Sequence, residues 1–216
     1  MDVAKSLKDA GVTKFLVSIH SHDRSVYQRL TGKDHLERAL EGLANISELG
    51  VPIIISHVIN RYNYRSLTGF IDYILQRCKT KPMFYFSLIR PNFILGNGKE
   101  IVPKLTEIEY YIYELFDYCK GKNISFLTEG IPFCYMIGFE KHNSEARRFM
   151  LEPIIHIEKD DIKTDVHANH FRENKAKDQA CRSCKAKSIC PRVWKEYGKL
   201  YGTGELFAIF NNIMID

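Results

Sequence analysis

The sequence predicts an α/β fold: a parallel sheet of about four strands, followed by a small cysteine-containing C-terminal subdomain. Two observations support this prediction. Four apolar, β-rich segments alternate with amphipathic helical patterns, and strands that alternate with helices form parallel sheets. After about residue 138 this pattern gives way to polar, lysine-rich sequence that holds three closely spaced cysteines. We therefore expect two domains, residues 1–138 and residues 139–216.

The predicted strands cover residues 13–19, 51–59, 83–89 and 123–127. Uninterrupted apolar runs, such as residues 53–55, are typical of strands that are buried on at least one face. Alternation over residues 153–162 predicts a hairpin or an edge strand.

Helical stripes fill the intervals between the strands, at residues 36–44, 67–78 and 106–119. Asp34 and Glu37 have the spacing of an N-terminal capping box, and Gly50 is expected just past the end of the first of these helices. Residues 1–10 predict an amphipathic helix and lack the pattern of a signal peptide. Cys78 and Cys119 lie on the apolar stripes and are expected to be small buried hydrophobes.

Composition places few limits on function. The net charge of +5 is mild for 216 residues, so it permits an anionic ligand or RNA without indicating either. No apolar run reaches the length of about 18 residues that a membrane span requires. We expect a cytoplasmic protein without membrane contact, in which the six cysteines are thiols or metal ligands rather than disulfides.

The strongest local signal is the spacing C-x-x-C-x5-C formed by Cys181, Cys184 and Cys190. Zinc and a [4Fe–4S] cluster both require four ligands, which are usually thiolates. Cys134, after the fourth strand, is the best candidate for the fourth ligand, whereas His167 or His170 in that role would favour zinc. Basic neighbours are expected to lower the pKa of these thiols; they are Arg182, Lys185 and Lys187.

Polar residues also follow each predicted strand. In parallel sheets of strand–helix units the ligand site lies at the carboxyl ends of the strands. The residues concerned are Ser18, His20, Ser21, His22 and Asp23, then His57, Asn60, Arg61 and Asn63, then Ser87, Arg90 and Asn92, and finally Thr128, Glu129 and Cys134. We expect this rim as a whole to be a ligand site.

Several segments, in this order and spacing, resemble the second half of a radical S-adenosylmethionine (SAM) domain and a cysteine-containing tail found in that superfamily. These segments are residues 17–21, 30–32, 39–43, 58–63, 128–134 and 181–205. The resemblance implies a partial (β/α) barrel that binds SAM across its strand tips. It further implies that Ser18, His20, Asn60, Ile89 and Arg90 contact SAM, and that Cys134, Cys181, Cys184 and Cys190 hold an auxiliary [4Fe–4S] cluster.

The sequence departs from the superfamily in one large respect. It contains neither the C-x-x-x-C-x-x-C triad that binds the SAM-cleaving cluster nor the Gly-Gly-Glu stretch that follows it. We expect the chain to be a fragment, one half of a split pair or a degenerate relative, inactive alone, and able to use SAM only with an N-terminal half or partner chain. It resembles radical SAM enzymes, so whether it is itself an enzyme stays open. A peptide or RNA is the expected class of substrate.

Two other functions compete with this one. A zinc-stabilised α/β module could bind nucleic acid or protein through basic residues near the cysteines, which are Arg172, Lys175, Lys177, Arg182, Lys185 and Lys187. A hydrolase built on His20, His57 and Asp23 lacks any recognisable nucleophile motif.

Overall fold

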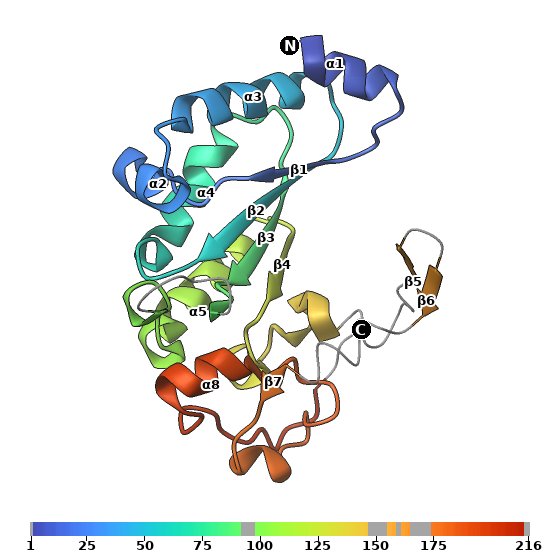
Figure 1. Cartoon of the computed structure of the whole chain (residues 1–216). Coiled ribbons are helices and arrows are strands. Elements are labelled where there is room, and N and C mark those ends of the chain that lie inside the picture. The colour runs from blue at the N-terminus through green and yellow to red at the C-terminus, as the bar shows by residue number, and fades with distance from the viewer. Residues whose placement is uncertain (1, 92–97, 147–154, 159–160, 165–173, 214–216) are drawn as a thin grey trace. The chain divides into compact units, whose positions relative to one another are not determined.

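The computed structural model describes residues 2–91, 98–146, 155–158, 161–164 and 174–213 (Figure 1). The chain divides into two compact units. One comprises Met1–Ser87 with Tyr110–Leu127, and the other Leu88–Glu109 with Thr128–Asp216. The predicted domain boundary after residue 138 stays a prediction.

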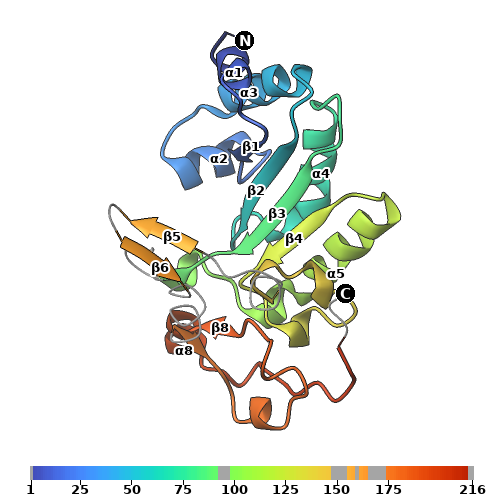
Figure 2. The same cartoon turned by 90° about the vertical axis from the view of Figure 1, so that its right-hand side faces the viewer.

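Four strands form one parallel sheet in the order β1-β2-β3-β4 (Figures 1 and 2). Their bounds are β1 (Phe15–Ser18), β2 (Ile53–Ile59), β3 (Met83–Leu88) and β4 (Phe126–Glu129). β1 and β2 are in parallel register, with Phe15 opposite Ile53 and Ser18 opposite Ser56. Each strand overlaps its predicted segment, so the predicted α/β class and the number of strands are confirmed.

Five helices accompany the strands in chain order: α1 (Asp2–Asp9), α2 (Arg24–Thr31), α3 (Leu36–Glu48), α4 (Leu67–Leu75) and α5 (Leu105–Gly121). The sequence predicted all of them except α2. That helix buries only Tyr27 among its eight residues, so it has no apolar stripe from which to predict it.

The helices of the first unit cover one face of the sheet. Along β2 the buried positions alternate, and His57 on this face lies with its ring 4.2 Å from that of Phe70 on α4. Phe116 of α5 stacks on Phe126 of β4 at 5.3 Å between ring centres. On the opposite face Leu16 is 67% exposed, so the unit by itself buries only one side of its sheet.

The start of α3 corrects one expectation. Its N-cap is His35, whose side chain makes no capping hydrogen bond. The predicted capping box is wrong because Asp34 instead accepts hydrogen bonds from Arg24, at 2.7 Å from Nε. The prediction for Gly50 is confirmed, since it follows the helix with φ of 66°, a conformation that favours glycine.

The second unit contains short elements. β5 (Ile155–Glu158) and β6 (Asp161–Thr164) pair as an antiparallel hairpin, as the alternation predicted (Figure 2). β7 (Lys175–Ala176) and β8 (Val193–Trp194) form a second antiparallel pair, and α8 (Lys195–Tyr201) follows directly. The sequence did not predict α8, which spans only seven residues.

Within the described ranges, no helix combines the length and the apolar character needed to cross a membrane. The cytoplasmic location stays a prediction.

A buried asparagine joins the ends of β1 and β2. Asn63 is 3% exposed. Its Oδ1 accepts a hydrogen bond from the Asn60 backbone N–H at 2.8 Å. Its Nδ2 donates to the carbonyl oxygens of His20 and Val58, both also at 2.8 Å. One side chain therefore satisfies buried backbone groups from two strands that are distant in sequence.

We predict that Asn63→Ala lowers the free energy of unfolding by about 2 to 3 kcal/mol, because the Asn60 N–H loses its partner inside the protein. Denaturant titration measures the change. Asn45→Ala on α3 is the matched control, and it should change stability by less than about 0.5 kcal/mol. Equal losses in the two variants would contradict the assigned role of Asn63.

Candidate metal centre

Three of the cysteines lie in one loop that a short ladder closes. β7 and β8 pair at its base, with Ala176 opposite Val193, so residues 177–192 form one loop between the two strands. Within it a 3₁₀ turn carries Cys181, and the Cys184 N–H donates to the Cys181 carbonyl at 3.4 Å. This compact turn lets two thiols three positions apart reach the same space.

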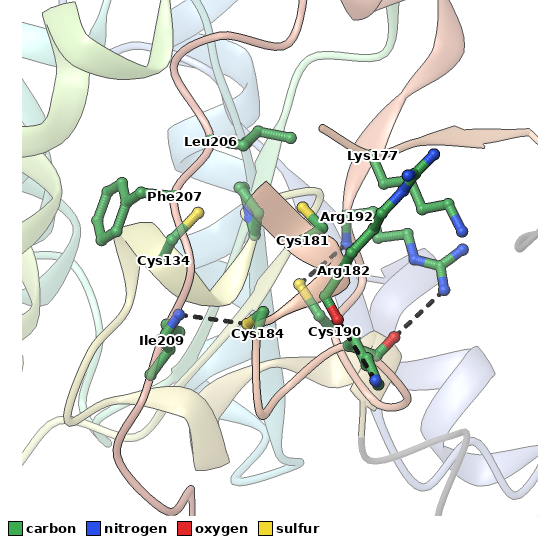
Figure 3. A pocket seen from close by; sticks show the side chains of 12 residues that line it. Cys134, Lys177, Cys181, Arg182, Cys184, Cys190, Arg192, Leu206, Phe207 and Ile209 are labelled. Atoms are coloured by element: carbon green, nitrogen blue, oxygen red, sulfur yellow. Dashed lines mark hydrogen bonds between the residues drawn. The ribbon is translucent and has the colours of Figure 1, made fainter. Parts of the chain in front are cut away.

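Cys134 joins these three from a separate segment. It lies on the 3₁₀ turn Phe133–Tyr135, which follows β4. All four thiols line one cavity of about 410 Å³, as Figure 3 shows. The four cysteines selected from the sequence are therefore brought together by the fold, and their role as metal ligands stays a prediction.

Backbone N–H groups point at two of the sulfurs. The Ile209 N–H donates to Cys184 Sγ at 3.3 Å, and the Arg192 N–H donates to Cys190 Sγ at 3.4 Å (Figure 3). Arg192 adopts φ of 60°, a left-handed conformation that costs energy for any residue except glycine. Hydrogen bonds to a sulfur favour the charged thiolate, which is the form that binds metals.

Burial has the opposite effect on the thiols themselves. It raises the pKa of Cys134 to about 12 and raises the pKa of Cys190. The lowering of the pKa expected from basic neighbours is therefore not found at these two residues, because the loss of solvent outweighs the backbone hydrogen bonds that the sulfurs accept. Burial therefore favours the protonated form of both thiols.

The spacing of the donors matters for the kind of centre they suit. In the described part of the chain, no three His, Cys, Asp or Glu side chains converge closely enough to hold a single metal ion. His167 and His170, the alternative ligands considered from the sequence, lie outside the described residues. Among the described residues that line the cavity, the four cysteines are the side chains of a type that binds metals.

A buried ion pair connects the two segments that supply the thiols. Lys175 Nζ lies 2.6 Å from Glu145 Oε1, and the two side chains are 3% and 2% exposed. The other carboxylate oxygen of Glu145 accepts a hydrogen bond from the Gly130 N–H at 2.7 Å. Gly130 lies four residues before Cys134, and Lys175 begins the ladder that closes the loop with the other three cysteines. Glu145 therefore contacts both segments that supply the thiols.

Close packing surrounds this pair. Lys175 Nζ lies 3.5 Å from the centre of the Trp194 ring, and the Arg90 guanidinium lies 3.8 Å from it. Burial lowers the pKa of Lys175, although the Glu145 carboxylate opposes the shift. A Cβ on Gly130, which has φ of 75°, would meet the Leu88 carbonyl oxygen at 3.3 Å. Glu145 was not among the residues predicted from the sequence. Lys175 was predicted to contact phosphate, but at 7% exposure this residue is too buried to do so.

A hydrogen-bond network around Glu205 positions the C-terminal segment that lines the cavity. Glu205 accepts hydrogen bonds from the Tyr197 hydroxyl at 2.5 Å and from the Thr106 N–H and hydroxyl at 3.0 and 2.7 Å. The Tyr135 hydroxyl donates to the Glu205 carbonyl at 2.9 Å. The next residue, Leu206, lines the cavity, so this network fixes one wall of the cysteine pocket.

The residues assigned to SAM fall in both units. Ser18 is exposed at the end of β1, and His20 is half-buried with its Nδ1 accepting from the Val58 N–H at 3.2 Å. Asn60 uses its amide within its own turn, donating to the Val58 carbonyl and accepting from the Tyr62 N–H. Ile89 and Arg90 follow β3 in the second unit. Their contact with SAM stays a prediction.

Other residues of the predicted rim have structural roles. Asp23 caps α2 by accepting from the Val26 N–H at 2.9 Å. His57 donates from Nδ1 to the Ile19 carbonyl at 3.1 Å, and burial lowers its pKa to about 3. A neutral, enclosed imidazole and a capping carboxylate do not favour the hydrolase hypothesis. Asn92 and Arg172 lie outside the described residues.

Sequence comparison places this chain beside a set of archaeal proteins. Over 72 residues it is 35% identical to a probable GTP 3′,8-cyclase of Saccharolobus islandicus, a match that covers 33% of this chain and 23% of that protein. The corresponding protein of Saccharolobus solfataricus is 33% identical over the same length. The matched region spans less than a quarter of these curated relatives. No protein-family model matches the chain.

Comparison with solved structures agrees with the sequence match. The fold resembles that of Streptococcus suis SuiB bound to S-adenosylmethionine, with a TM-score of 0.55, 16% identity and coverage of 91% of this chain and 53% of SuiB. A second SuiB structure gives a TM-score of 0.51. The chain is related to the radical SAM superfamily. The relationship predicted from the sequence is confirmed.

We predict that Lys175→Met in this radical SAM relative lowers the free energy of unfolding by about 3 to 5 kcal/mol, because it leaves the Glu145 carboxylate buried without its cation. Adding Glu145→Gln should restore part of the loss, since a neutral amide is cheaper to bury. Thermal and denaturant unfolding measure both variants. Lys195→Met at an exposed position serves as the control, and a similar loss there would contradict the prediction.

Proposed function

We propose that the chain is the part of a radical SAM protein that carries an auxiliary [4Fe–4S] cluster on Cys134, Cys181, Cys184 and Cys190. The observation that supports this proposal is the meeting of four thiols from two separate segments in one cavity. The fold relationship and the N–H groups directed at Cys184 and Cys190 are consistent with it. When bound, such a cluster supplies one-electron redox chemistry or a site for substrate ligation.

The superfamily relationship favours a cluster over zinc at these four thiols. A zinc ion needs four donors about 2.0 to 2.3 Å from one point. A [4Fe–4S] cluster distributes its four thiolate ligands over four irons, so they stand further apart. The four thiols line one cavity of about 410 Å³, and the relationship to the radical SAM superfamily favours the second case. The residues of the chain would bind the cluster, donate N–H groups to its sulfur ligands and exclude water from one side through Leu206.

The cleavage of SAM belongs to a further part of this proposal. The 216 residues contain no C-x-x-x-C-x-x-C triad. We propose that a polypeptide segment with this triad, on the same protein or on a partner chain, supplies the SAM-cleaving cluster, and that Ser18, His20, Asn60, Ile89 and Arg90 then contact SAM. A peptide or RNA remains the proposed substrate class.

Metal analysis tests the cluster. Protein purified without oxygen should contain about four iron and four sulfide per chain and be brown. Cys134→Ala and Cys184→Ala should each lose more than about half of the iron, because each removes one of four ligands. Cys78→Ala is the matched control, since Cys78 does not line the cavity, and it should retain the full content. One zinc per chain without colour would replace the proposal with a zinc module.

A second measurement tests the role of the absent triad. The reduced, iron-loaded chain should form no 5′-deoxyadenosine from SAM above the level of a heat-denatured control. Liquid chromatography with mass spectrometry detects this product. Formation that depends on Cys134 and Cys184 would show that the tail cluster cleaves SAM itself and would overturn its assignment as an auxiliary centre.

A further inference from the structure

Arginine and tyrosine side chains gather on the turn that follows β2, at residues 61–65. The guanidinium carbon of Arg65 lies 4.2 Å from the centre of the Tyr64 ring. The guanidinium carbon of Arg29, on α2, lies 4.1 Å from the centre of the Tyr62 ring. Both arginines are exposed, Tyr62 is half-buried and Tyr64 is buried. The turn and α2 therefore share one surface, and both belong to the first unit.

The aromatic part of this surface continues onto α5. The rings of Tyr64 and Tyr111 lie 5.2 Å apart, and those of Tyr111 and Tyr110 lie 5.3 Å apart, both in edge-to-face arrangements. Tyr110 is 70% exposed, so this series of rings begins inside the protein and ends at a ring that solvent reaches. Together, residues 24–33, 61–65 and 110–111 form what we call the arginine–tyrosine surface.

The turn at the centre of this surface is ordered by its own hydrogen bonds. The Tyr62 N–H donates to Asn60 Oδ1 at 2.9 Å, and the Tyr64 N–H donates to the Asn60 carbonyl at 3.1 Å. Asn63, which joins the ends of β1 and β2, lies between the two tyrosines in the sequence. A surface whose groups are held in place before binding loses less conformational entropy when a partner arrives.

The arginine–tyrosine surface is positively charged. Residues 24–33 hold three basic side chains and residues 61–65 hold two, and neither segment contains an acidic residue. The two flanking carboxylates are engaged locally: Asp23 caps α2 by accepting from the Val26 N–H, and Asp34 accepts from Arg24. Four of the five cations therefore keep their charge without a neighbouring carboxylate in these segments.

Two of these cations are available to a partner. Within the described ranges, the guanidinium groups of Arg29 and Arg65 make ring contacts but no hydrogen bond or ion pair. Their N–H donors can therefore bind the phosphate groups of a nucleic acid. A ring that an arginine stacks against is also a suitable platform for a base, because stacking and the cation–π contact reinforce each other.

The composition of this surface favours nucleic acid over protein as the partner. Among its residues, Tyr110 is the only large hydrophobic side chain that is exposed, whereas the centre of a protein–protein interface is apolar and depleted of charge. Basic side chains interleaved with aromatic rings are typical of proteins that bind single strands. Paired bases in a duplex cannot stack on such rings, so an unpaired strand is the better fit. Glu114, exposed one helical turn after Tyr110, limits the basic region at that end.

We propose that Arg29, Tyr62, Arg65 and Tyr110 form a binding surface for single-stranded RNA. The two tyrosines stack unpaired bases, and the two arginines bind phosphates along the strand. This inference selects RNA from the two substrate classes proposed above, and it rests on that proposal only for the reaction that follows binding. Binding itself requires neither a metal cluster nor SAM.

The test compares two variants of equal charge change. Arg29→Glu/Arg65→Glu reverses the proposed surface, and Lys5→Glu/Lys120→Glu reverses two exposed lysines elsewhere in the same unit. The probe is a fluorescein-labelled oligouridine of about 12 nucleotides, a length within the range that single-strand sites cover. Fluorescence anisotropy measures its affinity over a series of salt concentrations, and circular dichroism verifies that each variant is folded.

We expect the surface variant to bind the oligouridine about tenfold or more weakly at low salt, and the control pair to differ from the native protein by less than about twofold. The slope of log affinity against log salt should become shallower by about 1.4, because two phosphate contacts are lost. Tyr110→Ala should weaken binding by about fivefold or more, whereas Tyr110→Phe, which keeps the ring, should bind like the native protein. Equal affinities in the native protein and the surface variant would overturn the proposal.

Three further outcomes separate the possible failures. RNA binding by iron-free protein that depends on Arg29 and Arg65 would support this inference even if metal analysis refutes the proposed cluster. Equally tight binding of a double-stranded RNA would show that charge alone is recognised, and would overturn the assignment to a single strand. Binding of an acidic peptide that is lost in the surface variant, without any binding of RNA, would assign the surface to a protein and overturn the proposal.

Discussion

The cysteine cavity depends on one buried ion pair. Glu145 accepts from the Gly130 N–H through one oxygen and pairs with Lys175 through the other. These contacts fix the turn that leads to Cys134 and the base of the loop that holds the other three cysteines. A buried ion pair gains little net stability, because desolvation offsets most of the attraction. We infer that this one is retained for the geometry that it imposes on the four thiols.

The sheet could be predicted from the sequence because its signal is local. Uninterrupted apolar runs and helical stripes gave all four strands of the sheet and four of the five helices around it. α2 was missed because it buries only Tyr27, which leaves no periodic pattern. The cap of α3 was mistaken for a related reason. Asp34 has the spacing for a capping box, but Arg24, ten residues away, competes successfully for its carboxylate.

The residues of the candidate site could be predicted only where their spacing in the sequence is typical of metal ligands. The C-x-x-C turn and the Cys134 segment are visible in the sequence, and the fold places all four thiols on one cavity. Glu145 is different, because it lies in a charged stretch and its burial depends on a lysine 30 residues away. The Arg192 N–H directed at Cys190 was likewise hidden, since it requires a left-handed backbone at a residue other than glycine.

Some polar residues stabilise the fold, and others remain available to a ligand. Asp23 caps a helix and Asn63 satisfies backbone groups of two strands, so their place at the strand ends reflects the needs of tight turns. Lys175 is buried in its ion pair with Glu145 and is not available to a ligand. Lys177 and Arg182 are exposed and line the same cavity as the four thiols. Among the described residues, positive charge that these contacts leave unused therefore lies beside the four thiols.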